Sequence, residues 1–418
     1  MKSVGFAFTL LYTKHMQDEL RYAVGIDIGT NIVRALVGAI DNAGKITIIG
    51  YNEQPSSGMR KGTIVDANKT AQVVDKALVA VDEMSDYHVH RATVGINGSH
   101  IQGFGSRGVI AVGSQNREVS PDDIARVQGT ATEVQMPANR EILDITPRSY
   151  VLDDQKGIKD PIGLSGIRLE VDAYIITALI PHVKNIESIL DLNQIADRMI
   201  VPVGLASSRA VLTEQQKEHG VVHIDIGGST TNIAVYDEGD LIYSAVLPVG
   251  GDNVTNDLAI GLRTDLDIAE KVKIEYAVAM TSLRKGGGII RFKVDGETLS
   301  FPSDLVDEIV EARMEDIFRL VNDELRKIKK YANLPGGVVL TGGGCRLKGV
   351  AECAREFMQL SARVNKPTEY TGMGGKILDP AWATTVGLML IDLDGNAMQN
   401  TSKSKKKSGS LFGKMFKK

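Results

Sequence analysis

The sequence predicts an α/β protein of two pseudo-symmetric halves, with an α+β module inserted into the first half. The segment VGIDIGTNIVRALV (24–37) recurs as VHIDIGGSTTNIAV (222–235), shifted by 198 positions. Around both copies, short β-branched runs alternate with stretches whose apolar residues have helical spacing. The 418 residues are 43% hydrophobic and 24% charged, an ordinary globular composition with enough chain for two to four domains.

Composition narrows the class of protein further. The only cysteines are Cys345 and Cys353, which predicts a reducing compartment and no disulfide framework. No apolar run approaches the ~20 residues that a membrane span needs. The apolar patch at 4–12 lacks a convincing small-residue cleavage site, which argues against a signal peptide. We expect residues 1–20 to be an N-terminal extension, with Met16 as a candidate start.

Charge is spread unevenly along the chain. The whole chain has a formal charge of −4, and residues 401–418 hold seven lysines and no acid, so the other 400 residues carry −11. A basic tail on an acidic body predicts that the tail meets an anionic surface.

In the first half, the repeated segment at 24–37 is expected to form a strand, a glycine turn and a second strand. Residues 45–53 follow as a third strand after the turn at 42–44. The apolar spacing at 68–84 predicts a helix, and 92–96 is a further strand.

Residues 99–178 are expected to be a separate module of strands around one helix. That helix begins at Ser120, an N-cap residue followed by proline and two acids. The stretch GFGSRG at 103–108 matches the Gly-x-Gly-x-x-Gly pattern, but a β-branched run follows it where a dinucleotide site needs a helix. We therefore expect a glycine-rich hairpin there and no dinucleotide site.

The rest of the chain again alternates helices and strands. The expected elements are a helix at 183–192, a strand ending near 203, a small-residue helix at 205–216, the second repeat, a strand at 241–248, helices from 253 and at 267–278, a hairpin turning at 295–296, a long amphipathic helix at 303–331, a buried strand at 337–340 and a helix at 380–393.

Each repeat places an Asp, a Gly and then hydroxyl or amide side chains where an apolar strand ends. Asp27 and Asp225 are costly to bury without a partner, and hydrated Mg²⁺ suits two such carboxylates facing one cleft. Glycine lets the backbone approach a phosphate, and successive N–H groups bind anions. Asp-Gly is also common in ordinary turns, so the argument depends on the duplication. Additional donors would be Thr30, Asn31, Ser229 and Thr230.

A third glycine-rich loop, Gly342-Gly343-Gly344-Cys345-Arg346, follows a buried strand and precedes a helix. Such a loop allows close passage past a flat base, and a tight strand-to-helix turn is the alternative. No Gly-x₄-Gly-Lys-[Ser/Thr] occurs, which argues against a P-loop.

The order of hairpin, small-residue connecting helix, second hairpin, glycine loop and second connecting helix resembles the actin, sugar-kinase and heat-shock-chaperone superfamily. The stretches GLASSRAVLTE, DIGGSTTNIAV, KIEYAVA, VVLTGGG and PAWATTVGLM, with the insertion after VGING, closely resemble the FtsA family of bacterial cell-division proteins. The resemblance covers roughly residues 20–395, and the tail also matches.

The resemblance implies an actin-like ATPase fold with four subdomains. The implied division is subdomain 1A at 21–98, 179–215 and 380–395, inserted subdomain 1C at 99–178, subdomain 2A at 216–240 and 335–379, subdomain 2B at 241–334, a flexible linker at 396–410 and an amphipathic membrane-targeting helix at 411–418.

It also implies ATP and Mg²⁺ between the halves, with Asp27 and Asp225 facing the metal through water. Glu270 and Lys273 match a pair that contacts ribose and adenine, although an exposed salt-bridging helix face is the alternative. Arg346 and the loop at 342–344 match the adenine side. The implied phosphate ligands are Gly29, Thr30, Asn31, Gly227, Gly228, Ser229 and Thr230.

One departure concerns hydrolysis. Relatives that hydrolyse ATP well carry Glu, Gln or Asp at the start of the first connecting segment, to orient the attacking water. Here the segment at 202–205 is Pro-Val-Gly-Leu, and Glu214 is only a weak substitute. We therefore predict no catalytic residue and slow hydrolysis at most.

The terminal stretch is expected to bind anionic lipid as an interfacial amphipathic helix. On a helical wheel its bulky apolar residues cover about 140°, with lysines opposite. A disordered solubilising tail is one alternative, and the acidic body argues against nucleic acid. Eight residues should bind reversibly, and polymerisation would add avidity. The residues are Leu411, Phe412, Met415 and Phe416, opposite Lys414 and Lys417.

The function implied by the resemblance is a scaffold at the cytoplasmic face of the inner membrane, at the division site. It would tether the C-terminal peptide of FtsZ on subdomain 2B, assemble into filaments and recruit later division proteins through subdomain 1C. The alternatives are an actin-like ATPase of pilus assembly, a small-molecule kinase, for which no carboxylate base is evident, and a chaperone, for which no peptide-binding domain follows.

Overall fold

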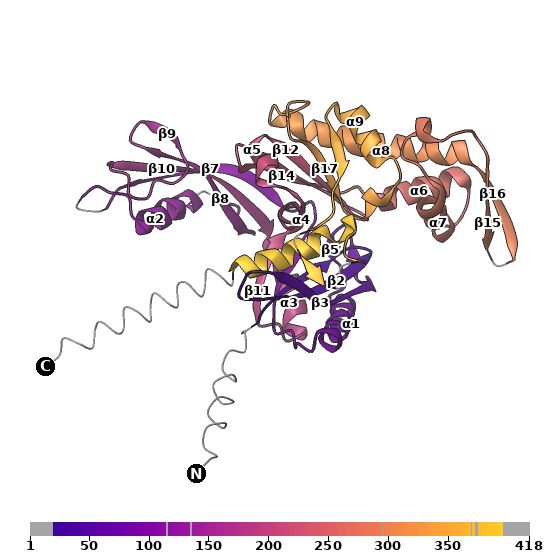
Figure 1. The fold of residues 1–418 in the computed structure, drawn as a ribbon, viewed down its shortest axis with the longest axis horizontal. Coiled ribbons are helices and arrows are strands. Elements are labelled where there is room, and N and C mark those ends of the chain that lie inside the picture. The colour runs from indigo at the N-terminus through magenta and orange to yellow at the C-terminus, as the bar shows by residue number, and fades with distance from the viewer. Residues whose placement is uncertain are drawn as a thin grey trace, which may run out of the picture.

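A computed structural model describes residues 20–113, 116–133, 136–294, 296–368, 370–372 and 375–395. The predicted extension at 1–19, the linker from 396 and the terminal helix lie outside the described residues, as does Asp295 in the predicted hairpin turn. Figure 1 shows two sheet-centred halves side by side and a module of its own sheet and helix projecting from them.

The two halves contain sheets of matching topology. The first sheet has the order β11-β6-β1-β2-β3-β19 and the second β18-β17-β12-β13-β14; in each, an antiparallel hairpin is flanked by parallel strands on one side. The first sheet comprises β1 (Arg21–Ile28), β2 (Ile32–Ile40), β3 (Ile46–Pro55), β6 (Arg91–Ile96), β11 (Asp197–Pro202) and β19 (Thr371–Gly372). The second comprises β12 (Val221–Ile226), β13 (Thr231–Asp237), β14 (Asp240–Leu247), β17 (Gly337–Thr341) and β18 (Ala362–Val364).

The register of the hairpins confirms the duplication residue by residue. Asp27 lies opposite Arg34, and Asp225 opposite Asn232, which is the same pair shifted by 198 positions. Strand β12 is buried along its whole length, as expected of a strand whose two faces are both covered.

Helices pack on these sheets, and helices are present where they were predicted at 68–84, 183–192, from 253, at 267–278, at 303–331 and after the loop at 342–346. Their bounds are α1 (Ala67–Ser85), α3 (Ile180–Leu192), α6 (Gly251–Leu262), α7 (Leu266–Tyr276), α8 (Ser303–Lys327) and α9 (Val350–Met358). Two hairpins complete this part: β4 (Met59–Arg60) with β5 (Thr63–Ile64), and β15 (Ile289–Val294) with β16 (Glu297–Pro302).

Two connecting helices cross between the halves: α4 (Val203–Val211) and the helix at 383–395. At the crossing, a Cβ on Gly387 would lie 1.7 Å from the carbonyl oxygen of Ala206. The helices therefore touch backbone to backbone, which only glycine allows.

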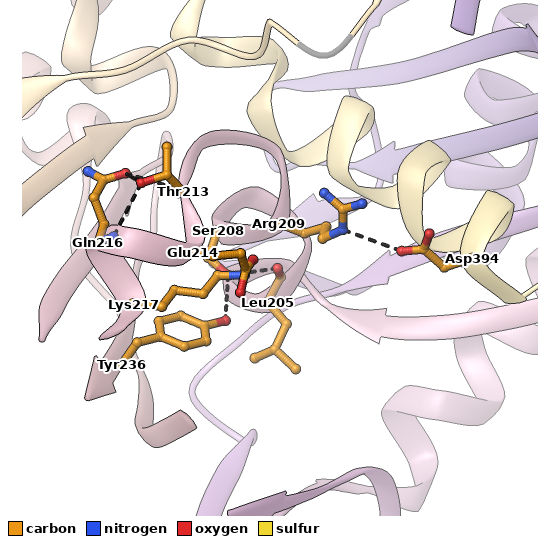
Figure 2. Close-up of polar contacts among 9 residues, drawn as sticks. All are labelled: Leu205, Ser208, Arg209, Thr213, Glu214, Gln216, Lys217, Tyr236 and Asp394. Atoms are coloured by element: carbon orange, nitrogen blue, oxygen red, sulfur yellow. Dashed lines mark hydrogen bonds and ion pairs between the residues drawn. The ribbon is translucent and has the colours of Figure 1, made fainter. Parts of the chain in front are cut away.

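The expected single helix at 205–216 is wrong. Helix α4 ends at Val211, and a short helix α5 (Glu214–Glu218) begins after it. The cause is a capping box in which the Thr213 side chain accepts from the Gln216 N–H at 3.2 Å while Gln216 Oε1 accepts from the Thr213 N–H at 2.8 Å (Figure 2).

The inserted module folds around a sheet of order β7-β10-β8-β9, with α2 packed on it. Ser120 caps α2 in a capping box, as its sequence predicted. The module's elements are β7 (Gln102–Ala111), α2 (Pro121–Thr132), β8 (Arg140–Leu152), β9 (Gln155–Ile158) and β10 (Arg168–Leu179).

The hairpin expected at 103–108 is also wrong, because this stretch runs straight through β7. A Cβ on Gly103 would lie 2.2 Å from the Tyr174 hydroxyl, and one on Gly108 would lie 2.1 Å from the Val127 carbonyl oxygen of α2. The glycines therefore make room for neighbouring elements and do not mark a turn.

Candidate functional site

The two repeated hairpins turn toward one cleft of about 420 Å³ that lies between the halves. Side chains or backbone from both hairpins, from the loop at 342–344 and from α7 line it. The structure thus brings together nearly all of the residues predicted from the sequence: Asp27, Gly29, Thr30, Asn31, Asp225, Gly227, Gly228, Thr230, Glu270, Lys273, Gly342, Gly343, Gly344 and Arg346. Ser229 is the exception, since it stands beside the cleft without lining it.

The hairpin turns have the same geometry. The Gly29 N–H donates to the Ile32 carbonyl at 3.2 Å, and the equivalent Gly227 N–H donates to the Thr230 carbonyl at 2.8 Å. Within the described chain, the backbone N–H groups at the two tips, at 30–31 and 228–229, donate to no protein acceptor. Two pairs of free N–H groups beside one cleft are a donor set that suits the phosphate oxygens of a nucleotide.

Two carboxylates lie at the bottom of the cleft. Burial raises the pKa of Asp27 to about 6, and the Arg34 charge partly opposes this shift. Burial also raises the pKa of Asp225 to about 7, with a further contribution from Asp27. The nearby Asn232 is 2% exposed, and its Oδ1 has no hydrogen-bond partner. Two carboxylates and an unpaired carbonyl oxygen are the hard oxygen donors that a hydrated divalent cation requires.

Contacts between the halves close the cleft at the hairpin tips. Asn31 Nδ2 donates to Asp252 Oδ1 at 2.6 Å, and Asn97 Nδ2 donates to Thr230 Oγ1 at 3.0 Å. Asp252 and Asn97 both line the cleft, and sequence reasoning missed both. Asp252 follows the glycines at 250–251 at the start of α6, outside both repeats, so the duplication did not indicate it.

Glu270 and Lys273 face the cleft and also bind each other. Lys273 Nζ lies 2.6 Å from Glu270 Oε2 and donates to Thr255 Oγ1 at 2.8 Å and to the Gly251 carbonyl at 3.1 Å. The Lys273 side chain is 14% exposed and that of Glu270 is 42% exposed, so the two form the salt bridge of the alternative, but on a helix face that lines the cleft.

The loop at 342–344 packs closely against β12 on one side and faces open space on the other. Gly342 has φ +88°, and a Cβ there would lie 2.3 Å from Asp225 Oδ1. A Cβ on Gly343 would meet no atom within 4 Å. Arg346, at the end of the loop, donates to both carboxylate oxygens of Asp379 at 3.0 Å. The open side leaves room for a flat group.

The start of the first connecting helix presents an apolar surface to the cleft. Val203 is the residue of this segment that lines it. Glu214 lies away from the cleft: its side chain is 86% exposed and accepts from Lys217 Nζ at 2.8 Å (Figure 2). Glu214 therefore does not occupy the position from which a carboxylate could orient a water molecule in the cleft.

Comparison with known proteins identifies a family. A model described as "Cell division protein FtsA" matches residues 222–387, and one described as "SHS2 domain inserted in FTSA" matches residues 98–177. Among curated relatives, the FtsA proteins of Pseudomonas aeruginosa and Bacillus subtilis are 37% and 36% identical, covering 91% and 88% of this chain and 92% and 82% of their own. The FtsA of Escherichia coli K12 is 32% identical over 88% of this chain and 90% of its own.

Solved structures show the same fold at lower identity. A chain from a PilM-PilN type IV pilus biogenesis complex matches with a TM-score of 0.64 and 15% identity, over 88% of this chain and 98% of its own. MreB5 of Spiroplasma citri bound to ADP matches with a TM-score of 0.53 and 13% identity, over 90% and 98%. The actin-like ATPase fold predicted from the sequence is confirmed.

Proposed function

The chain belongs to the FtsA family of cell-division proteins, and from this premise we propose that it is an ATP-binding scaffold of the division machinery. It anchors FtsZ to the cytoplasmic face of the membrane at the division site, polymerises and recruits later division proteins. The observation that carries the proposal is the pair of matched hairpin turns facing one cleft between the halves.

ATP with Mg²⁺ is the proposed ligand of this cleft. The free N–H groups of both hairpin tips hold the phosphates, and Asp27 and Asp225 hold the hydrated metal, which neutralises phosphate charge. Glu270 and Lys273 lie where the ribose and base would extend, and the loop at 342–344 provides a flat, open wall. The donors present therefore fit both groups.

Subdomain 2B is the proposed site of the FtsZ C-terminal peptide. A groove of about 750 Å³ runs between α6, α7 and the β15–β16 hairpin. Ile260 is 77% exposed at this groove, and Arg263 lines it as well. Exposed apolar side chains next to a cation suit a short peptide that combines hydrophobic and acidic residues.

The inserted module is the proposed contact for later division proteins. Among the module's described residues, four large apolar side chains are exposed: one lies on β7 and the others lie on the segment before β10. Exposed apolar residues gathered on one small module favour a protein contact. They are Val109, Ile162, Leu164 and Ile167.

The membrane contact is assigned to the terminal segment at 411–418, which lies outside the described residues. No helix in the described part of the chain is long and apolar enough to cross a membrane. Attachment by the terminal segment is therefore a proposal from sequence, based on its two phenylalanines, one methionine and one leucine among lysines.

The test is co-sedimentation of the full-length protein and of a variant lacking residues 411–418 with anionic liposomes, with and without FtsZ and ATP. We expect the full-length protein to pellet with the liposomes and to carry FtsZ with it, and the truncated protein to stay in the supernatant with FtsZ. Neutral liposomes are the matched control. Membrane binding that survives the deletion would contradict the assignment of the tail, and failure to carry FtsZ would contradict the scaffold.

We also propose that nucleotide acts mainly as a structural ligand. The apolar Val203 occupies the segment where efficient hydrolases carry a water-orienting side chain. Phosphate release by the purified protein should therefore be slow, and a turnover of many per second would contradict this view. The pilus-assembly alternative is supported only by a likeness of fold at 15% identity, whereas relatives at 32–37% identity favour division.

A further inference from the structure

Asp252 forms an unusual contact at the hairpin tips. Asn31 and Ser229 occupy equivalent positions in the two repeats, 198 residues apart, and both donate to the carboxylate of Asp252. Each takes one carboxylate oxygen, at 2.6 Å in both cases. One carboxylate therefore holds a matched pair of donors, one from each half of the molecule.

The position of Asp252 is fixed by the backbone of α6. Its own N–H donates to the Gly228 carbonyl at 2.7 Å, and the preceding Gly251 N–H donates to the Gly227 carbonyl at 2.9 Å. A Cβ on Gly250 would lie 2.6 Å from both of these carbonyl oxygens. The start of the helix is thus held against the second hairpin, and this fixes the Asp252 backbone beside the hairpin tips.

We propose that the Asp252 carboxylate is an internal competitor for the phosphate chain of the nucleotide. It offers Asn31 and Ser229 what a phosphate would offer, which is two oxygen acceptors with negative charge, and it lines the same cleft. When phosphates enter, these donors turn from the carboxylate to the phosphate oxygens. The carboxylate loses these two hydrogen bonds when the donors turn.

This arrangement has two consequences. Without nucleotide, Asp252 holds the two hairpin tips together across the cleft. With nucleotide, it competes with the phosphate oxygens for these two donors, so it weakens the binding of a nucleotide whose phosphates reach the donors and leaves an uncharged nucleoside unaffected. The inference rests on the proposed nucleotide site and adds to it a residue that determines specificity.

The experiment measures binding of ATP, ADP and adenosine by calorimetry to the full chain and to the variant Asp252→Asn, with Mg²⁺ present. Asparagine keeps the shape and an acceptor oxygen but removes the charge. A hydrogen bond to a charged group contributes about ten- to a hundredfold to affinity. A hydrogen bond between neutral groups contributes about half of that free energy. We therefore expect ATP to bind about tenfold more tightly to the variant, ADP by a smaller factor and adenosine unchanged.

Two controls separate competition from other effects. Asp267→Asn removes the same charge from an exposed position on α7 and should leave all three affinities unchanged. In a background of Asn31→Ala with Ser229→Ala, the gain from Asp252→Asn should largely disappear, because the carboxylate then has no donors to compete for. Hydrogen exchange at 29–31 and 228–230 in the nucleotide-free variant should be faster than in the wild type.

The outcomes are distinguishable. If Asp252→Asn binds ATP as tightly as the wild type does, or more weakly, Asp252 does not compete with phosphate, while the nucleotide site stands. Weaker binding is the result expected if the carboxylate helped to hold the metal. A gain that persists in the double-alanine background would show a general charge effect and would also overturn it. If the wild-type protein binds no ATP, both this inference and the proposed site fail.

Discussion

The glycine loop at 342–344 offers a matched pair of substitutions that separates folding from binding. Gly342 has φ +88°, and its Cβ would lie 2.3 Å from Asp225 Oδ1 and 2.4 Å from the Ile226 carbonyl oxygen. A side chain at positive φ costs about 1–2 kcal/mol, and overpacking against backbone costs about 1–3 kcal/mol more. We therefore expect Gly342→Ala to lower the free energy of unfolding by about 2–5 kcal/mol.

Gly343→Ala is the control for stability and the test for the site. Its Cβ meets nothing within 4 Å, and φ is not positive, so its free energy of unfolding should stay within about 1 kcal/mol of the wild type. Because Gly343 lines the cleft, the added methyl group enters the space assigned to the nucleotide and should weaken ATP binding. Urea unfolding at 25 °C measures the first quantity and nucleotide titration the second. Equal urea midpoints for both variants would refute the packing argument, and unchanged ATP affinity in Gly343→Ala would place the base elsewhere.

Two further substitutions test the junction between the halves and a buried histidine. Gly387→Ala should destabilise the protein by about 3 kcal/mol, because its Cβ would lie 1.7 Å from the Ala206 carbonyl oxygen. The matched change Gly204→Ala should be tolerated, because the nearest atom to its Cβ would be 3.4 Å away. Equal thermal midpoints of the two variants would contradict the close helix contact at Gly387. Burial lowers the pKa of His223 to about 3, so the unfolded chain binds a proton first as pH falls below 6.5, and the histidine's contribution to stability is lost progressively from there downward. Between pH 7 and pH 5, the free energy of unfolding of the His223→Gln variant should therefore fall by about 2 kcal/mol less than that of the wild type, as measured by urea unfolding. The variant is compared with the wild type because the raised pKa values of the two cleft carboxylates change stability with pH in the opposite direction. Identical losses in the two proteins would contradict a neutral buried histidine.

Much of the fold could be predicted because it depends on local pattern. Buried strands, helical spacing and the cap at Ser120 gave most elements within a few residues. The failures came from contacts that the local pattern does not contain. The glycines at 103–108 suggested a turn, but they are required by Tyr174 and by α2, which are distant in sequence. The break between α4 and α5 had a local signal in Thr213 and Gln216, which the small-residue pattern concealed.

The candidate site also contains residues that the sequence predicted and residues that it did not predict. Residues that the duplication repeats, such as Asp27 and Asp225, could be found because each copy supports the other. Asn97 and Asp252 have no counterpart in the pattern, and only the folded chain brings them to the cleft. Ser229 was predicted as a phosphate donor from its place after the second repeated glycine and from the family resemblance, and in the structure its hydroxyl donates to Asp252.

In the proposed nucleotide site, the donors come from the duplicated hairpins and their acceptor comes from outside them. Two copies of one hairpin supply equivalent donors at Asn31 and Ser229, and both find a protein acceptor in the structure. The acceptor is Asp252, which belongs to neither hairpin and arrives on α6. The start of α6 is bonded to the second hairpin through the Gly227 and Gly228 carbonyl oxygens, so a change at this hairpin tip meets α6 first. A nucleotide that draws Asn31 and Ser229 away from Asp252, as proposed above, would therefore change contacts at the start of α6, which forms one wall of the proposed FtsZ groove.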